Sequence, residues 1–170
     1  MKIYFAQIMD NLAYYEHEKR ICDILEGLGH TVYFPWRDEG VIFEDQSTLQ
    51  DSQKTFETDV AHIKDCDAMI AYIDGNDPGT AVETGIAYAL GKPVALYCTE
   101  FAKLHKGQDI SKVYPIDVLP ANSHQYWKVQ SDPLINNMLL GVSNHTVLNT
   151  PEEIKEWLAE LEDKFDKVDQ

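Results

Sequence analysis

Two carboxylates six residues apart are the side chains of this sequence best suited to chemistry. Asp77 lies in a Gly/Pro-rich turn directly after the apolar run Ala68–Ile73, and Glu83 lies near the start of the helix predicted to follow. In an open parallel sheet, such a turn comes after the carboxyl end of a strand, where ligands bind. A pair of carboxylates at that place has the composition needed to break a glycosidic bond.

Both acids also have structural interpretations, which the sequence leaves open. Thr80 and Glu83 have the spacing of a capping box, in which Glu83 would bond the Thr80 amide. Asp77 precedes a proline, and Asp-Pro is common in turns. Gly79 and Gly85 reduce the bulk on either side of Glu83. Because glycine inside a helix costs roughly 1 kcal/mol relative to alanine, Gly85 favours close approach of a ligand or of another backbone.

Two further polar residues are candidates for the same site. Tyr4 lies in a predicted strand on the face opposite Ile3 and Phe5, so its hydroxyl is able to reach the carboxyl edge of the sheet. An aromatic side chain in a strand is more commonly part of the core. Asp59 falls in a predicted helix, and the sequence does not show which way it faces.

The elements that must position these residues alternate between strand and helix. Strands are predicted at 2–6, 31–34, 68–73 and 94–98, and helices at 11–28, 47–64, 80–90 and from Pro151 onward. A loop is expected from Trp36 to Asp45, a fifth strand near Val113–Val118 and a loop or short helix near Pro133–Leu140. The pattern predicts one α/β domain over residues 1–170, with a doubly wound, flavodoxin- or Rossmann-like parallel sheet of about five strands and a polar tail at 163–170.

The charge of the chain narrows its possible partners. Lys and Arg total 14 against 29 Asp and Glu, a formal net charge of −15 in 170 residues. Such a surface repels nucleic-acid polymers and anionic membranes, whose binding needs clustered cations. Three cysteines without CxxC spacing predict buried, reduced thiols in a cytoplasmic protein. No run approaches the ~20 apolar residues of a membrane span, and the scattered histidines predict no metal site.

Taken together, these residues resemble those of the nucleoside 2-deoxyribosyltransferase family. The central match runs from Asp67 to Pro93, where Asp77 is followed by Glu83 in an x-Glu-x-Gly-x-Ala context. The resemblance covers about residues 2–145. Three other positions match the family. Asp59 corresponds to an acid of the family's pocket and Ile3–Phe5 to the family's first strand. Asn136 corresponds to an asparagine that reaches the sugar site of a neighbouring subunit.

The resemblance implies a cofactor-free transferase of nucleotide salvage that exchanges the nucleobase of 2′-deoxyribonucleosides. Glu83 would attack the anomeric carbon to form a deoxyribosyl–enzyme ester, and Tyr4 would orient Glu83. Asp77, with Asp59, would bind the base and pass the proton that lets it leave. A second base then attacks from the face that the first one left, so configuration is retained. Asn136 would contact the sugar of an adjacent protomer, which implies a dimer or hexamer.

Two features depart from the family pattern. The turn after the first strand usually contains glycine, whereas Ala6–Asp10 contains none, so Gln7 or Asp10 is expected to touch substrate in an unusual way. Some members end in a tyrosine whose terminal carboxylate enters the pocket, and this chain ends in Asp169–Gln170.

Two other functions stay open on the sequence. A related hydrolase would cleave the N-glycosidic bond of deoxynucleosides or their 5′-monophosphates, but the latter need a phosphate cradle that Ala6–Asn11 does not supply. A non-catalytic nucleoside-sensing module would use the same crevice, with Glu83 as a cap or a hydroxyl acceptor. Loss of turnover without loss of binding in Glu83→Gln separates an enzyme from a sensor.

Overall fold

Five parallel strands form one sheet in the computed structural model, which describes residues 1–8, 12–40, 49–74, 77–98 and 135–168. The strand order is β2-β1-β3-β4-β5, the flavodoxin-like order of a doubly wound sheet. This confirms the predicted α/β fold. The strands are β1 (Lys2–Ala6), β2 (Thr31–Tyr33), β3 (Ala68–Tyr72), β4 (Val94–Tyr97) and β5 (Val147–Leu148).

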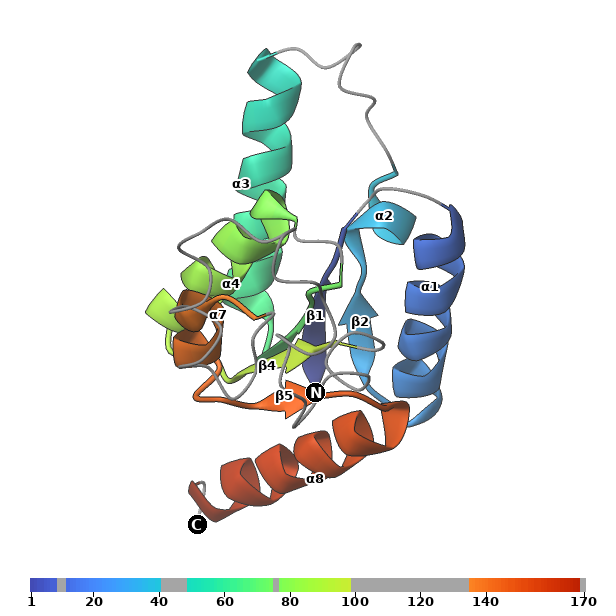
Figure 1. Cartoon of the computed structure of the whole chain (residues 1–170), viewed down its shortest axis with the longest axis vertical. Helices are drawn as coiled ribbons and strands as arrows, with labels where there is room; N and C mark the ends of the chain where they lie inside the picture. Colours follow the sequence, from blue (N-terminus) through green and yellow to red (C-terminus); the bar gives the residue numbers. More distant parts are fainter. Residues whose placement is uncertain (9–11, 41–48, 75–76, 99–134, 169–170) are drawn as a thin grey trace, which may run out of the picture.

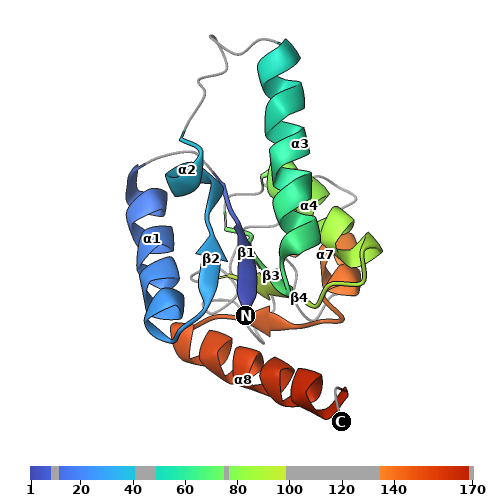
Figure 2. The same cartoon turned by 180° about the vertical axis from the view of Figure 1, so that it is seen from behind.

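Helices cover both faces of the sheet (Figures 1 and 2). On one face lie α1 (Leu12–Gly27) and α8 (Pro151–Val168), and on the other lie α3 (Leu49–Asp65), α4 (Pro78–Ala89) and α7 (Asn137–Val142). A single-turn helix, α2 (Pro35–Asp38), follows β2. The helix that follows β1 and the helix that follows β3 therefore cover opposite faces, which makes the β1/β3 boundary the topological switch point.

Strand β1 shows how the alternation of side chains builds two cores. Ile3 and Phe5 pack with α1 and α8, whereas Tyr4 and Ala6 pack toward α3 and α4. In the register, Tyr4 lies level with Met69 of β3. All four of these β1 side chains are at most 1% exposed, as expected for a strand inside a parallel sheet. Tyr4 thus lies on the face opposite Ile3 and Phe5, as the alternation predicts.

Several expected boundaries differ from the observed ones. The fifth strand is β5 at Val147–Leu148, and the strand expected near Val113–Val118 lies outside the described residues. The short helix α2 occupies part of the loop expected after Trp36. Helix α7 begins later than the element expected near Pro133–Leu140, and α8 continues to Val168, through most of the expected polar tail. The three cysteines are buried thiols that form no disulfide in the described structure.

Helix α1 carries a fully buried acid, Glu18. Glu18 is 0% exposed, and neither of its carboxylate oxygens has a hydrogen-bond partner among the described residues. Burial without a partner raises the pKa of Glu18 to about 8. The folded protein therefore keeps this carboxyl protonated across most of the neutral range.

The variant Glu18→Met should raise the free energy of unfolding, and more so at pH 8 than at pH 5. Above its ordinary pKa of 4.5, the carboxyl ionises in the unfolded chain but stays protonated in the folded one up to about pH 8. Stability is therefore lost as pH rises through that window. We expect a gain of about 1–3 kcal/mol at pH 8, measured by denaturant unfolding. The exposed neighbour variant Glu16→Met is the matched control, and an equal gain at both pH values would contradict the assignment.

Candidate active site

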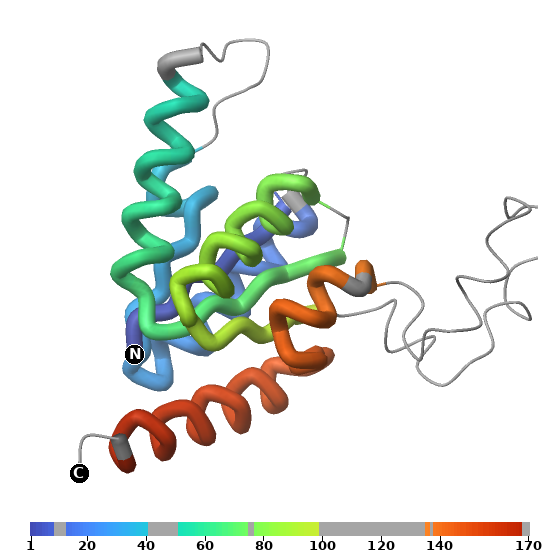
Figure 3. Tube along the Cα trace, turned by 90° about the vertical axis from the view of Figure 1, so that its left-hand side faces the viewer, coloured from blue at the N-terminus to red at the C-terminus, as the bar shows by residue number. Residues whose placement is uncertain are grey.

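A cavity of about 860 Å³ opens between α3 and α4 at the carboxyl edge of the sheet. Residues between Ser52 and Ile63 of α3 form one wall, and this helix rises beyond the strands (Figure 3). The cavity lies at the β1/β3 switch point, and ligands bind at such points in open α/β sheets. The lining residues are Gln7, Pro35, Glu39, Gly40, Ser52, Lys54, Thr55, Phe56, Thr58, Asp59, Val60, Ile63, Pro78, Gly79, Val82, Glu83 and Ile86.

A hydrogen bond between Tyr4 and Glu83 joins strand β1 to helix α4 at the wall of this cavity. The Tyr4 hydroxyl donates to Oε1 of Glu83 at 2.7 Å. The Tyr4 side chain is fully buried, and its ring packs against that of Tyr33 with centroids 5.3 Å apart. The phenol is therefore held in place, and it fixes the orientation of the Glu83 carboxyl.

The pKa of Glu83 is raised to about 7. Desolvation is the largest cause, and the negative charges of Asp59, Asp77 and Glu39 add to it. The hydrogen bond from Tyr4 acts in the opposite direction, because it stabilises the ionised form. Glu83 is thus poised to change charge near neutral pH, a property that is common for carboxylates in active sites.

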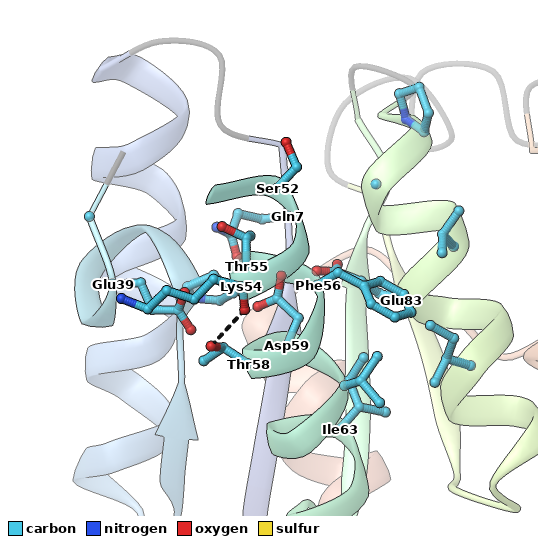
Figure 4. A pocket seen from close by; sticks show the side chains of 17 residues that line it. Gln7, Glu39, Ser52, Lys54, Thr55, Phe56, Thr58, Asp59, Ile63 and Glu83 are labelled. Atoms are coloured by element: carbon cyan, nitrogen blue, oxygen red, sulfur yellow. Dashed lines mark hydrogen bonds between the residues drawn. The ribbon is translucent and has the colours of Figure 1, made fainter. Parts of the chain in front are cut away.

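Asp59 reaches the same cavity from helix α3, which answers the question of its facing. Its carboxylate and that of Glu83 point toward one another between the two helices (Figure 4). Oδ1 of Asp59 is buried without a hydrogen-bond partner in the described part of the chain. Desolvation raises the pKa of Asp59, and a hydrogen bond with Tyr4 and the charge of His62 act in the opposite direction. The Asp59 carboxyl is therefore placed to exchange a proton with a molecule bound in the cavity.

Asp77 is positioned differently from Asp59. It is the N-cap of α4, and its Oδ2 accepts from the Thr80 backbone amide at 2.5 Å. Helix α4 thus begins at Pro78 and not near Thr80, so the predicted capping box between Thr80 and Glu83 is wrong. Asp77 is not among the described residues that line the cavity. The negative charge of Asp77 nevertheless acts on the site, because it contributes to the raised pKa of Glu83.

The two glycines beside Glu83 have different surroundings. Gly79 lines the cavity, and a Cβ atom there would lie 2.9 Å from Oδ2 of Asp77. The missing side chain at 79 therefore permits the Asp77 cap. Gly85 is exposed, and a Cβ atom there would meet nothing within 4 Å in the described structure. The expected close approach of another backbone to Gly85 is not found in this part of the chain.

The variant Gly85→Ala should therefore stabilise the protein by about 0.5–1 kcal/mol, since alanine restricts the unfolded chain and clashes with nothing here. Thermal or denaturant unfolding measures the change. Gly91→Ala at the end of the same helix is the contrasting control, because Gly91 has φ +72° and alanine is strained there. A loss of stability in Gly85→Ala would contradict the open surface and show that something packs on this face.

Gln7 and Asn136 occupy two contrasting positions. Gln7 lies just beyond β1, is 5% exposed and lines the cavity. Asn136 is exposed and caps α7, where its side chain accepts from the Met138 amide at 2.8 Å. Asn136 is not among the described lining residues of its own chain's cavity. Its predicted contact with the sugar of an adjacent protomer stays a prediction.

The sequence did not point to Glu39, which also lines the cavity. Desolvation and the charge of Asp59 raise the pKa of Glu39, and the Tyr33 hydroxyl donates to it. Lys54 is the one cation among the lining residues that the structure describes. Glu39 follows α2, in a segment that was expected to be a loop. Because a loop has no periodic hydrophobic pattern, the sequence could not indicate that Glu39 lies near Asp59.

The described residues contain no cluster of three or more side chains able to ligate a metal ion. None of their helices combines the length and the apolar character that crossing a membrane requires.

The sequence of this chain also matches a known protein family. The model of the nucleoside 2-deoxyribosyltransferases matches residues 3–149 of the chain. The chain belongs to this family. No curated protein matches the sequence significantly.

Solved structures of similar fold include a 2-deoxyribosyltransferase from Bacillus psychrosaccharolyticus. It is 25% identical, with a TM-score of 0.64, and the match covers 95% of this chain and 96% of the other. A conserved protein from Enterococcus faecalis is 22% identical with a TM-score of 0.63, over 96% and 98% of the two chains. A CMP N-glycosidase from Clostridium botulinum is 20% identical over 95% and 99% of the chains, and its TM-score of 0.48 supports no inference about activity.

Proposed function

We propose that this nucleoside 2-deoxyribosyltransferase family member exchanges the nucleobase of 2′-deoxyribonucleosides through a covalent deoxyribosyl–Glu83 intermediate. The observation that supports the proposal is the 2.7 Å hydrogen bond from Tyr4 to Glu83 at the wall of a cavity with room for a nucleoside. One oxygen of Glu83 is held by the phenol, which leaves Oε2 for attack on the anomeric carbon. A carboxylate nucleophile of this kind needs no metal or organic cofactor.

In the first half-reaction, Oε2 of ionised Glu83 forms a bond to C1′ as the N-glycosidic bond breaks. The electron pair of the broken bond stays on the base nitrogen, and a proton from a carboxyl group neutralises the leaving base. Asp59 suits this step because its carboxyl lines the cavity and desolvation raises its pKa above the ordinary value. Asp77 caps α4 and is not among the described lining residues, so its part in this proposal is the negative charge that adds to the raised pKa of Glu83.

In the second half-reaction, an acceptor base attacks C1′ from the face that the first base left. Asp59 takes the proton from the attacking base, and the ester to Glu83 breaks, which regenerates the carboxylate. Two displacements at the same carbon retain its configuration. The absence of a 2′-hydroxyl makes the oxocarbenium-like transition state easier to reach, and the neighbouring carboxylates stabilise its positive charge.

The charge of the cavity favours nucleosides over nucleotides as substrates. Three acids, Glu39, Asp59 and Glu83, line it with Lys54 as the one described cation. A 5′-phosphate would add about two negative charges to this acidic site. Hydrolysis of nucleoside monophosphates is therefore the less favoured reaction, and a preference for dCMP over deoxycytidine would overturn this choice.

A chromatographic assay tests the proposed function. Purified protein is incubated with thymidine or deoxyinosine as donor and with adenine or cytosine as acceptor. Formation of deoxyadenosine or deoxycytidine that needs the acceptor supports base exchange. Release of free base at the same rate without acceptor would show a hydrolase instead, and no reaction with any pair would leave a binding module.

A further inference from the structure

Gln7 carries two unused hydrogen-bonding groups at the candidate active site. Its side chain is 5% exposed and lines the cavity together with Asp59 and Glu83 (Figure 4). Neither Nε2 nor Oε1 of Gln7 has a hydrogen-bond partner among the described residues, and both atoms are buried. Leaving a buried polar group unpaired destabilises a protein, because the group has lost its hydrogen bonds to water and gained none in return. An unpaired amide at the wall of a binding cavity is what a ligand of matching polarity would satisfy.

We infer that the Gln7 amide reads the hydrogen-bonding edge of the nucleobase, both for the base that leaves and for the base that enters. This inference rests on the proposed base exchange and extends it to the residue that recognises the base. A primary amide offers one donor side and one acceptor side in a single plane. A partner that satisfies both sides at once must present an acceptor and a donor next to each other in a plane.

Nucleobases have this pattern, and 2-deoxyribose does not. Adenine and cytosine carry an amino group beside a ring nitrogen, and thymine and hypoxanthine carry an N–H beside a carbonyl oxygen. Glutamine pairs with such edges through two hydrogen bonds. The hydroxyl groups of 2-deoxyribose point in separate directions, and the carboxylates of the cavity are able to accept from them one at a time. The base edge is therefore the better match for Gln7.

The same amide is able to serve both classes of base. Amino bases and oxo bases present their donor and acceptor in opposite order. Rotation of the terminal amide of Gln7 by about 180° reverses its own order, because its oxygen and nitrogen are nearly equal in size. A base-exchange enzyme must bind two different bases in turn at one site. Gln7 is thus a base-recognition residue that discriminates little between the two classes.

Direct binding to the Gln7→Met variant tests this inference. Methionine keeps the length of the side chain and removes both hydrogen-bonding groups. Calorimetry measures the Kd of adenine, of thymine and of 1,4-anhydro-2-deoxyribitol, a sugar ring without a base. The Kd of both bases should rise about tenfold to hundredfold, the loss of two net hydrogen bonds. The Kd of the sugar analogue should stay within about twofold, since no contact to the sugar is removed.

Two controls accompany the measurement. Gln53→Met removes an exposed glutamine on α3 that bonds Glu57 at 2.8 Å and does not line the cavity, so all three Kd values should be unchanged. Thermal unfolding of Gln7→Met should occur at or above the temperature of the unaltered protein, because an unpaired buried amide has been removed. Gln7→Ala is the second variant, with the same expected pattern of binding.

The outcomes separate this inference from the proposed function. Unchanged base affinity in Gln7→Met, a loss confined to one base class, or a loss confined to the sugar analogue overturns the role of Gln7, whether or not exchange occurs. Loss of affinity for both bases in a protein without exchange activity supports Gln7 as the base reader and overturns the transferase proposal alone. Failure of the unaltered protein to bind any base overturns both.

Discussion

The variant Glu83→Gln should lower the rate of base exchange by about 10³-fold or more and leave the affinity for free adenine within about threefold. Glutamine keeps the shape of the side chain and its hydrogen bond from Tyr4, but its amide oxygen is too weak a nucleophile to form the sugar ester. The loss should appear in kcat and in kcat/KM alike, since the missing bond forms only during reaction. The exchange assay measures the rate and calorimetry measures adenine binding.

Glu156→Gln is the matched control for this experiment. Glu156 is an exposed acid on α8, which packs on the face of the sheet away from the cavity, so its exchange rate should equal that of the unaltered protein. Trapping the ester under denaturing conditions and mapping it by mass spectrometry should find the deoxyribosyl group on Glu83. Exchange above about a tenth of the normal rate in Glu83→Gln would exclude this residue as the nucleophile.

The second large effect concerns the pH dependence of kcat/KM. Because only the ionised form of Glu83 attacks, kcat/KM should fall as pH decreases through about 7, the pKa to which burial raises this carboxyl. Tyr4→Phe removes the hydrogen bond that stabilises the ionised form and should move this acid limb upward by about one to two pH units. At pH 7, where half of Glu83 is ionised in the unaltered protein, the variant should therefore be about fivefold to fiftyfold slower.

Asp59→Asn supplies the opposite shift. The negative charge of Asp59 contributes to the raised pKa of Glu83, so removing this charge should move the acid limb to lower pH. The maximal rate should also fall, because the proton donor is lost. Opposite shifts in these two variants would be hard to obtain from structural damage alone. The assignment fails if both variants show the limb of the unaltered protein with only a lower plateau.

The predictable part of the site depends on periodicity and on strand ends. The alternation of Ile3, Tyr4 and Phe5 is a period-2 pattern, and it correctly placed Tyr4 on the face toward α3 and α4. The turn after β3 placed Glu83 at the carboxyl edge by the general rule for parallel sheets. These signals are local, and each needed only a few residues of context.

Other features depend on contacts that no local pattern contains. The facing of Asp59 is fixed by how α3 packs, and the pairing of Tyr4 with Glu83 joins residues 79 positions apart. Glu18 has no hydrogen-bond partner among the described residues, which contradicts the usual rule that a buried carboxylate is paired. Strand β5 has two residues, too few for a periodic signal, and it follows Asn144 and His145 with positive φ.

The bond between Tyr4 and Glu83 also links catalysis to the completeness of folding. Its donor is in β1 and its acceptor in α4, and β1 is paired directly with β3, the strand that leads into α4. An incompletely folded or newly synthesised chain that lacks the β1–β3 pairing cannot orient its glutamate. Under the proposed function such a chain would be inactive, and the appearance of activity during refolding should report formation of the central strand pair.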